Sequence, residues 1–269
     1  MGPGEAYSIL SAVAWAFGVI CMRKTSQQLD PLSFNIFKIA LAIILVFVTF
    51  LFSQETVPFA SISIRDLVVL VVSGIIGIGI ADTLWLAALR STDATTMAIV
   101  DCAYSPSVVF MSFLFLAERL TVLQFIGGIC ILMSVFTVIP SKQDKLKPGF
   151  IAGGKLQGVL LGALAVVLMA IGVVLMKPIL RNLPVLFTTE VRLISGFSVL
   201  LLLSVFSKKK TKLKESFLTA ENKKIIFLGA FLGAYLAMIF WIAGFKYTTA
   251  SIAAILNQTS TIFIIILAV

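Results

Sequence analysis

Two carboxylates lie inside long apolar runs, and they are the residues with the greatest capacity for chemistry. Asp82 is the only charged residue in 67–89, and Asp101 is the only one in 94–117. A carboxylate surrounded by hydrocarbon must pair with another group, face a water-filled cavity or be protonated. Each could therefore contact a solute or carry a proton. The alternatives are a hydrogen bond between helices for Asp101 and a position at the membrane interface for Asp82.

Asp101 has polar neighbours along its own predicted helix. Ser105 lies four residues further on, and side chains at this spacing share a helix face. Pro106 has no N–H to donate to the carbonyl of Cys102, so we expect a kink there that leaves an acceptor free. Tyr104 could line a cavity beside these groups, although aromatic side chains in apolar helices more often pack or face lipid.

Basic residues also lie inside apolar segments. Lys38 and Arg192 each lie about two helical turns into such a run. Lys38 could pair with Asp82, whereas both basic side chains could instead extend to the membrane surface. Trp85 follows Asp82 by three residues, so it shares the helix face of that carboxylate.

The composition argues against several classes of chemistry. With no His among 269 residues, there is no imidazole base or ligand, and the three Cys all lie in apolar runs. The stretch 149–155 fits the GxxxxGK spacing of a nucleotide-binding loop, but Leu156 follows where a Mg²⁺-binding Ser or Thr should stand. We therefore expect no cofactor, no metal site and no enzymatic activity.

The distribution of apolar residues predicts an all-α membrane protein. Sixty per cent of residues are hydrophobic and 12% are charged, against about 25% charged in ordinary soluble domains. A membrane-crossing helix needs about 20 apolar residues. Nine such spans are predicted, at 5–22, 32–52, 67–89, 94–117, 120–140, 157–177, 185–206, 225–245 and 248–269. The protein should be multi-pass and reside in the plasma or inner membrane.

Most of the net charge of +9 comes from two lysine-rich loops, at 142–155 and 208–224. Nucleic acid is a poor partner for them, because no aromatic platform or DNA-binding fold surrounds these lysines. Anionic lipid headgroups and topology signals explain them better. The expected partners are thus the lipid bilayer and a small-molecule solute; nothing in the sequence indicates a homodimer.

The chain contains an internal repeat. Placing Trp85 over Trp241 gives an offset of 156 residues, and nearer the N-terminus the offset is 153–154. The matched pairs include Pro31/Pro184, Lys38/Arg192, Gly77/Gly233, Asp101/Asn257 and Ser105/Thr261. Asp82 falls on Met238, so this charge is not repeated.

Each repeat unit holds five spans, an odd number, so the two copies would cross the membrane in opposite directions. Such inverted repeats are common in transporters, with a site at the repeat interface near the midplane. The predicted architecture is therefore a first repeat at 1–140, a basic linker at 141–156 and a second repeat at 157–269. The polar pairs Asp101/Ser105 and Asn257/Thr261 should meet at its centre.

Several short motifs carry a resemblance to a known family. They are Trp15-Ala-Phe-Gly18, Ala88-Leu-Arg-Ser-Thr-Asp-Ala94, Pro106, Leu116-Ala-Glu118-Arg119-Leu120-Thr121 and Gln124-x-x-Gly127. In order, spacing and duplication, the chain resembles the EamA family of the drug/metabolite transporter superfamily over nearly its whole length. Two departures are Lys38, where the family usually has Arg, and the absence of a second Glu-Arg/Lys turn.

The resemblance implies ten helices in two halves and transport of small metabolites without ATP hydrolysis. We expect a secondary transporter, more specifically an exporter working by alternating access, with Asp82 and Asp101 as candidates for proton coupling. The alternative is a non-transporting membrane sensor or assembly protein built on the same helical bundle. The duplicated polar face favours transport, because a structural bundle need not repeat it.

Two further expectations concern topology and length. The loops after odd-numbered spans hold most of the Lys and Arg, which would place the N-terminus outside the cell. The family resemblance implies an N-terminus inside, and we expect that arrangement. The offset places the mate of span 120–140 at about 276–296, the length of one spanning helix, so the tenth helix is expected to be missing from this chain.

Overall fold

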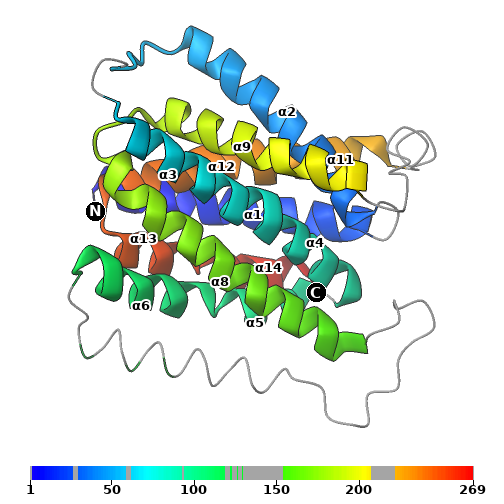
Figure 1. Ribbon diagram of the computed structural model, residues 1–269. Coiled ribbons are helices and arrows are strands. Elements are labelled where there is room, and N and C mark those ends of the chain that lie inside the picture. Colours follow the sequence, from blue (N-terminus) through cyan, green and yellow to red (C-terminus); the bar gives the residue numbers. More distant parts are fainter. Residues whose placement is uncertain are drawn as a thin grey trace.

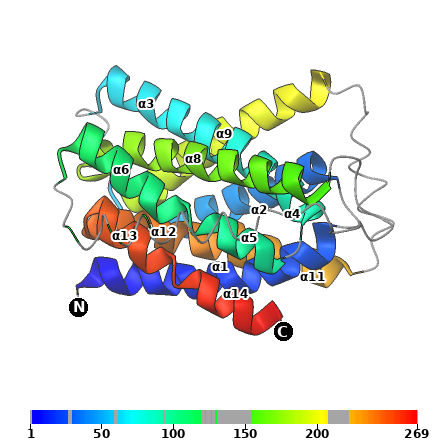
Figure 2. The same ribbon diagram turned by 90° about the horizontal axis from the view of Figure 1, so that it is seen from below.

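The computed structural model describes residues 2–26, 30–58, 62–92, 94–118, 122, 126, 129, 154–206 and 222–268. Within this part of the chain the regular structure is entirely helical. Figures 1 and 2 show the helices packed beside one another with their axes broadly aligned. The predicted span at 120–140 and both lysine-rich loops lie almost wholly outside the described residues.

The first segment begins with two long helices, α1 (Pro3–Ser26) and α2 (Pro31–Phe52). A third long helix is built from α3 (Ile64–Gly74), the π-helical segment η2 (Ile75–Ile80) and α4 (Ala81–Ser91). Two shorter helices follow, α5 (Ala94–Asp101) and α6 (Tyr104–Leu116). Asp30 begins α2 as an N-cap, and the next residue is a proline, which suits the first helical position.

The second segment repeats this order. It contains α8 (Gly154–Leu180), α9 (Val185–Phe206) and a composite helix made of α11 (Lys223–Ala230), η3 (Phe231–Leu236) and α12 (Ala237–Tyr247). The short helices α13 (Ala250–Asn257) and α14 (Ser260–Ala268) complete it. The bounds of η2, α4 and α5 recur in η3, α12 and α13 with the offset of 156 residues found in the sequence.

Seven helical stretches of the described chain are long and apolar enough to cross a membrane. They run Pro3–Lys24, Pro31–Phe52, Ile64–Ser91, Thr96–Leu116, Leu156–Leu180, Val185–Val205 and Lys223–Tyr247. Each overlaps one predicted span, which confirms those seven as apolar helices. The last predicted span, 248–269, differs because its apolar helical stretch is shorter, Ala250–Ile264.

Two predicted spans are not continuous helices. The predicted helix at 94–117 is interrupted at Cys102 and Ala103, where backbone N–H groups bond carbonyls three residues back at 3.1 and 3.0 Å. Pro106 explains part of this break, since it lacks the N–H that would bond the carbonyl of Cys102. The predicted helix at 248–269 breaks at the matching place, Gln258–Thr259, without a proline.

The two segments pack against each other in a reciprocal way. Helix α1 packs along α12 and α14, while its counterpart α8 packs along α4 and α6. Glycine allows the closest approaches: a Cβ on Gly18 would lie 2.9 Å from the Cα of Gly233, and one on Gly172 would lie 3.1 Å from the Cα of Gly77. These two contacts are repeat mates of each other, so the same crossing is built twice.

Candidate functional site

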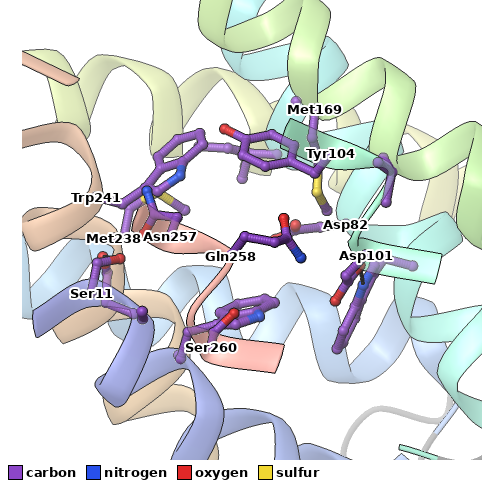
Figure 3. A pocket seen from close by; sticks show the side chains of 18 of the residues that line it. Ser11, Asp82, Asp101, Tyr104, Met169, Met238, Trp241, Asn257, Gln258 and Ser260 are labelled. Atoms are coloured by element: carbon purple, nitrogen blue, oxygen red, sulfur yellow. Dashed lines mark hydrogen bonds between the residues drawn. The ribbon is translucent and has the colours of Figure 1, made fainter. Parts of the chain in front are cut away.

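A cavity of about 120 Å³ lies between the two segments. One water molecule needs about 10–15 Å³ of such a cavity, so the cavity has room for on the order of ten water-sized groups. Figure 3 shows its side chains converging from several helices. The wall comprises Ser11, Ala12, Trp15, Gly77, Ile78, Asp82, Trp85, Asp101, Tyr104, Val166, Met169, Arg192, Gly233, Ala237, Met238, Trp241, Asn257, Gln258 and Ser260. Six of the nine residues singled out in the sequence are among them.

Most of the wall consists of repeat mates. Seven pairs are present: Ala12/Val166, Trp15/Met169, Gly77/Gly233, Asp82/Met238, Trp85/Trp241, Asp101/Asn257 and Tyr104/Ser260. The interruptions of the two broken helices place Asp101 and Asn257 at the ends of α5 and α13, where both side chains line the cavity. Each segment therefore contributes an equivalent set of positions, with different chemistry at several of them.

Asp101 is held by an indole rather than by a basic side chain. Trp85 Nε1 donates to Asp101 Oδ1 at 2.7 Å, and the Trp85 ring lies against Trp15 with ring centroids 5.2 Å apart. Trp85 is only 2% exposed, so its position is fixed by the surrounding core. Asp101 thus combines two positions that the sequence offered as alternatives: its carboxylate makes a hydrogen bond between helices, and it also lines the cavity.

Lys38 and Asp82 form a buried ion pair. Lys38 Nζ lies 2.7 Å from Asp82 Oδ2, and their side chains are 2% and 9% exposed. The alternative in which the Lys38 side chain extends to the membrane surface is therefore wrong, because the ammonium group is buried against Asp82. Asp82 lines the cavity, whereas Lys38 is not among the lining residues.

Arg192 is also buried, at 1% exposed, so the surface position considered for it is wrong. Its guanidinium carbon lies 5.4 Å from the centre of the Trp241 ring, and Nη1 contacts the sulfur of Met176 at 2.9 Å. Its Nε has no hydrogen-bond partner in the described part of the chain. Arg192 occupies the position of Lys38 in the repeat, but the mate of Asp82 is Met238.

Residues 2–139 and 156–269 match the EamA-like transporter family as two repeated segments. The chain belongs to the EamA family. A solved crystal structure of a protein is similar to it, with a TM-score of 0.66 and 14% identity over 98% of this chain and 87% of that one, which shows a shared fold. No curated protein matches the chain.

Membership in the EamA family confirms the resemblance drawn from the motifs. Together with the seven long apolar helices, it identifies an integral, multi-pass membrane protein of a transporter family. The two matched segments correspond to the two helical segments of the structure. The cavity between them is therefore the candidate binding site of an EamA protein.

Two further candidates, Ser105 and Thr261, do not line the cavity of this EamA protein. The continuous helix face expected for Asp101 and Ser105 is absent, because the chain turns at residues 102–103, and Ser105 is 3% exposed outside the wall. The Thr261 hydroxyl instead lies 3.3 Å from the carbonyl oxygen of Ala98 and 3.6 Å from the sulfur of Cys102. It therefore joins the two broken helices rather than facing the cavity.

Ser11, Met169 and Met238 are among the wall residues that the sequence did not single out as candidates. Met169 and Met238 are the repeat mates of Trp15 and Asp82, so the offset alone could have indicated both. Nothing in the sequence indicated Ser11. Its hydroxyl donates to the Ala237 carbonyl of the other segment at 3.0 Å, a tertiary contact that sequence spacing does not reveal.

Glu118, part of the family motif, reaches from the end of α6 to the second segment. Its carboxylate oxygens accept hydrogen bonds from the backbone N–H groups of Ala250 and Ser251 at 3.1 and 3.2 Å, and from the Ser251 hydroxyl at 2.6 Å. An acceptor at a helix N-terminus satisfies free N–H groups and complements the helix dipole. Glu118 thus fixes the start of α13, which carries Asn257 into the cavity.

Glu190, in α9, has a buried Oε2 atom that has no partner among the described residues. It does not line the cavity.

Proposed function

We propose that this EamA protein is a secondary transporter that exports a small metabolite by alternating access. The observation that carries the proposal is the cavity itself, whose wall is built from matched positions of both segments. The reciprocal packing of α1 on α12 and of α8 on α4 is consistent with an inverted repeat. In such folds, rocking of one half against the other exposes a central site to each side in turn.

The broken helices support the same proposal. Transporter sites are commonly formed where spanning helices are discontinuous, because the interrupted turns bring polar groups to the midplane. Here the breaks at 102–103 and 258–259 adjoin Asp101 and Asn257. Irregular backbone inside a membrane is tolerated where it is buried in protein or lines a cavity. Ala103 in the first break is buried, and Gln258 in the second lines the cavity.

We assign proton coupling to Asp101 rather than to Asp82. Asp82 is held by Lys38 at 2.7 Å, so protonating it would leave a buried ammonium group without its partner. Asp101 has the neutral indole N–H of Trp85 as its donor and lines the cavity directly. A proton could therefore bind Asp101 without disrupting an ion pair.

The test compares cells that produce the protein, cells that produce Asp101→Asn and cells that produce neither. We expect the unchanged protein to lower the intracellular amount of at least one small metabolite in an untargeted screen. The Asp101→Asn variant should reach the membrane and retain the fold but lose transport or its dependence on a pH gradient. Equal metabolite levels in all three, with verified protein in the membrane, would contradict the proposal.

A further inference from the structure

The two repeats differ in one respect that bears on the ligand. In the first segment the basic residue Lys38 has a carboxylate partner, Asp82, at 2.7 Å. In the second segment the matching basic residue is Arg192, and the matching partner position holds Met238. The carboxylate that neutralises the first site thus has no counterpart in the second. Arg192 is left as a cation in the cavity wall without an anion within salt-bridge distance among the described residues.

A buried cation without a counter-ion is costly, so its retention needs a reason. The ring of Trp241 and the sulfur of Met176 compensate the guanidinium only weakly, because neither carries a charge. Its Nε donor has no partner at all in the described chain. An anionic group entering the cavity would supply both the charge and the acceptor that are missing.

Two more donors line the same cavity as Arg192. The hydroxyl of Tyr104 and the side-chain nitrogen of Asn257 are buried, line the cavity and find no acceptor among the described residues. Tyr104 adjoins Trp241, with ring centroids 6.5 Å apart, and Figure 3 shows both of these side chains with Asn257 around the same end of the cavity. A group with two acceptor oxygens suits this cluster, since a carboxylate can take a bidentate pair from Arg and further donors as well.

We propose that the cavity binds a small monocarboxylate, with its carboxylate on Arg192 and an apolar body against the aromatic and thioether side chains. The proposal rests on the proposed transport function. The charges of the wall limit the ligand to one negative group. Lys38 is already paired with Asp82, so Arg192 is the cation that remains for the ligand. The carboxylate of Asp101 in the same wall would repel a second negative group on the ligand. The apolar part faces Trp15, Met169 and Trp85. The volume suits a solute of about ten non-hydrogen atoms.

The chain offers a direct readout of binding. Its three tryptophans, Trp15, Trp85 and Trp241, all line the cavity, so intrinsic fluorescence reports on this site alone. The probes are phenylacetate, the isosteric neutral phenylacetamide and the dianion phenyl phosphate, titrated into purified protein in detergent at pH 7. We expect saturable quenching by phenylacetate, with at least about tenfold weaker binding of the other two, the value of one charged hydrogen bond.

Substitutions test whether Arg192 and Tyr104 bind the carboxylate of phenylacetate. Arg192→Gln should weaken phenylacetate binding at least about tenfold and leave phenylacetamide binding unchanged. Tyr104→Phe, which removes one oxygen atom, should weaken phenylacetate binding by a smaller factor, and it decides the matter should Arg192→Gln not fold. The control is Lys246→Gln, because Lys246 bonds the Leu183 carbonyl outside the cavity and should not affect either probe.

The outcomes separate this inference from the proposed function. Equal affinity for phenylacetate and phenylacetamide, tighter binding of phenyl phosphate, no saturable quenching by phenylacetate, or unchanged affinity in both cluster variants would overturn the monocarboxylate assignment. Uptake of radiolabelled phenylacetate into proteoliposomes is then measured. Specific binding without any uptake would contradict transport while supporting the assigned ligand class. Uptake of neutral or cationic solutes alone would support transport and overturn the assignment.

Discussion

Replacing one partner of the Lys38–Asp82 ion pair should destabilise the fold strongly, and replacing both should recover most of the loss. The charged atoms lie 2.7 Å apart, and the two side chains are 2% and 9% exposed. Removing either partner leaves the other charge buried without its counter-ion, which costs about 3–5 kcal/mol. The second segment suggests the replacement residue, since Met238 stands at the position that matches Asp82. The variants are therefore Lys38→Met, Asp82→Met and the double substitution.

The double variant tests whether the two charges stabilise each other. A well-packed apolar pair is often as stable as the buried ion pair that it replaces, or more stable. The free energy of unfolding of the double variant should thus lie within about 2 kcal/mol of the unchanged protein. The two single losses would then exceed the double loss by at least about 3 kcal/mol, which is the coupling energy of the pair.

Unfolding is followed by tryptophan fluorescence as a denaturing detergent is titrated into mixed micelles. Asp66→Asn is the control, because Asp66 lies in the first turn of α3 and forms no salt bridge among the described residues. Its loss should cost about 1 kcal/mol or less, the value of a charge near a helix N-terminus. Additive losses in the double variant, or single losses no larger than that of the control, would refute the reasoning.

Three other predictions follow from the packing and the topology. Gly18→Val should lower the yield of folded protein, because a Cβ there would meet the Gly233 backbone at 2.9 Å, and overpacking of this kind costs about 1–3 kcal/mol; size-exclusion profiles check it. Glu118→Gln should destabilise the protein by about 1–3 kcal/mol, the cost of losing charged hydrogen bonds, and exchange of the first amides of α13 should accelerate. A single cysteine introduced in loop 208–224 should react with an impermeant reagent from outside intact cells; protection would place the N-terminus outside.

Hydrophobic runs predicted the positions of the long helices, because a membrane-crossing helix must satisfy its own backbone and so leaves a continuous apolar signature. The repeat predicted more than the number of helices. The offset that aligned Trp85 with Trp241 also aligns the π-helical segments η2 and η3, which no hydropathy pattern reveals. It also brought the central candidates together, since Asp101, Asn257 and Trp85 all reach one cavity.

The remaining features depended on tertiary contacts that sequence spacing does not encode. Lys38 and Arg192 have flexible side chains that reach either a membrane surface or an interior partner, and only the position of Asp82 decides for Lys38. Ser105 was expected on the face of Asp101, but i and i+4 share a face only where the helix is continuous. The hydrogen bond from Trp85 to Asp101 joins two helices, so neither residue alone predicts it.

The cavity wall contains repeat positions that are identical in the two segments and repeat positions that differ, and the two kinds have different roles. Positions that are alike in both segments, Gly77/Gly233 and Trp85/Trp241, control how closely helices approach and how wide the cavity is. In an alternating-access cycle, both copies of such a position would shape the cavity in the inward-open and the outward-open state. A substitution in either copy would therefore impair both states. A ligand's charge, in contrast, needs one complementary group in one place. The difference between Asp82 and Met238 leaves Lys38 paired with a carboxylate and Arg192 without one among the described residues, whereas a symmetric pair of carboxylates would have neutralised both basic residues.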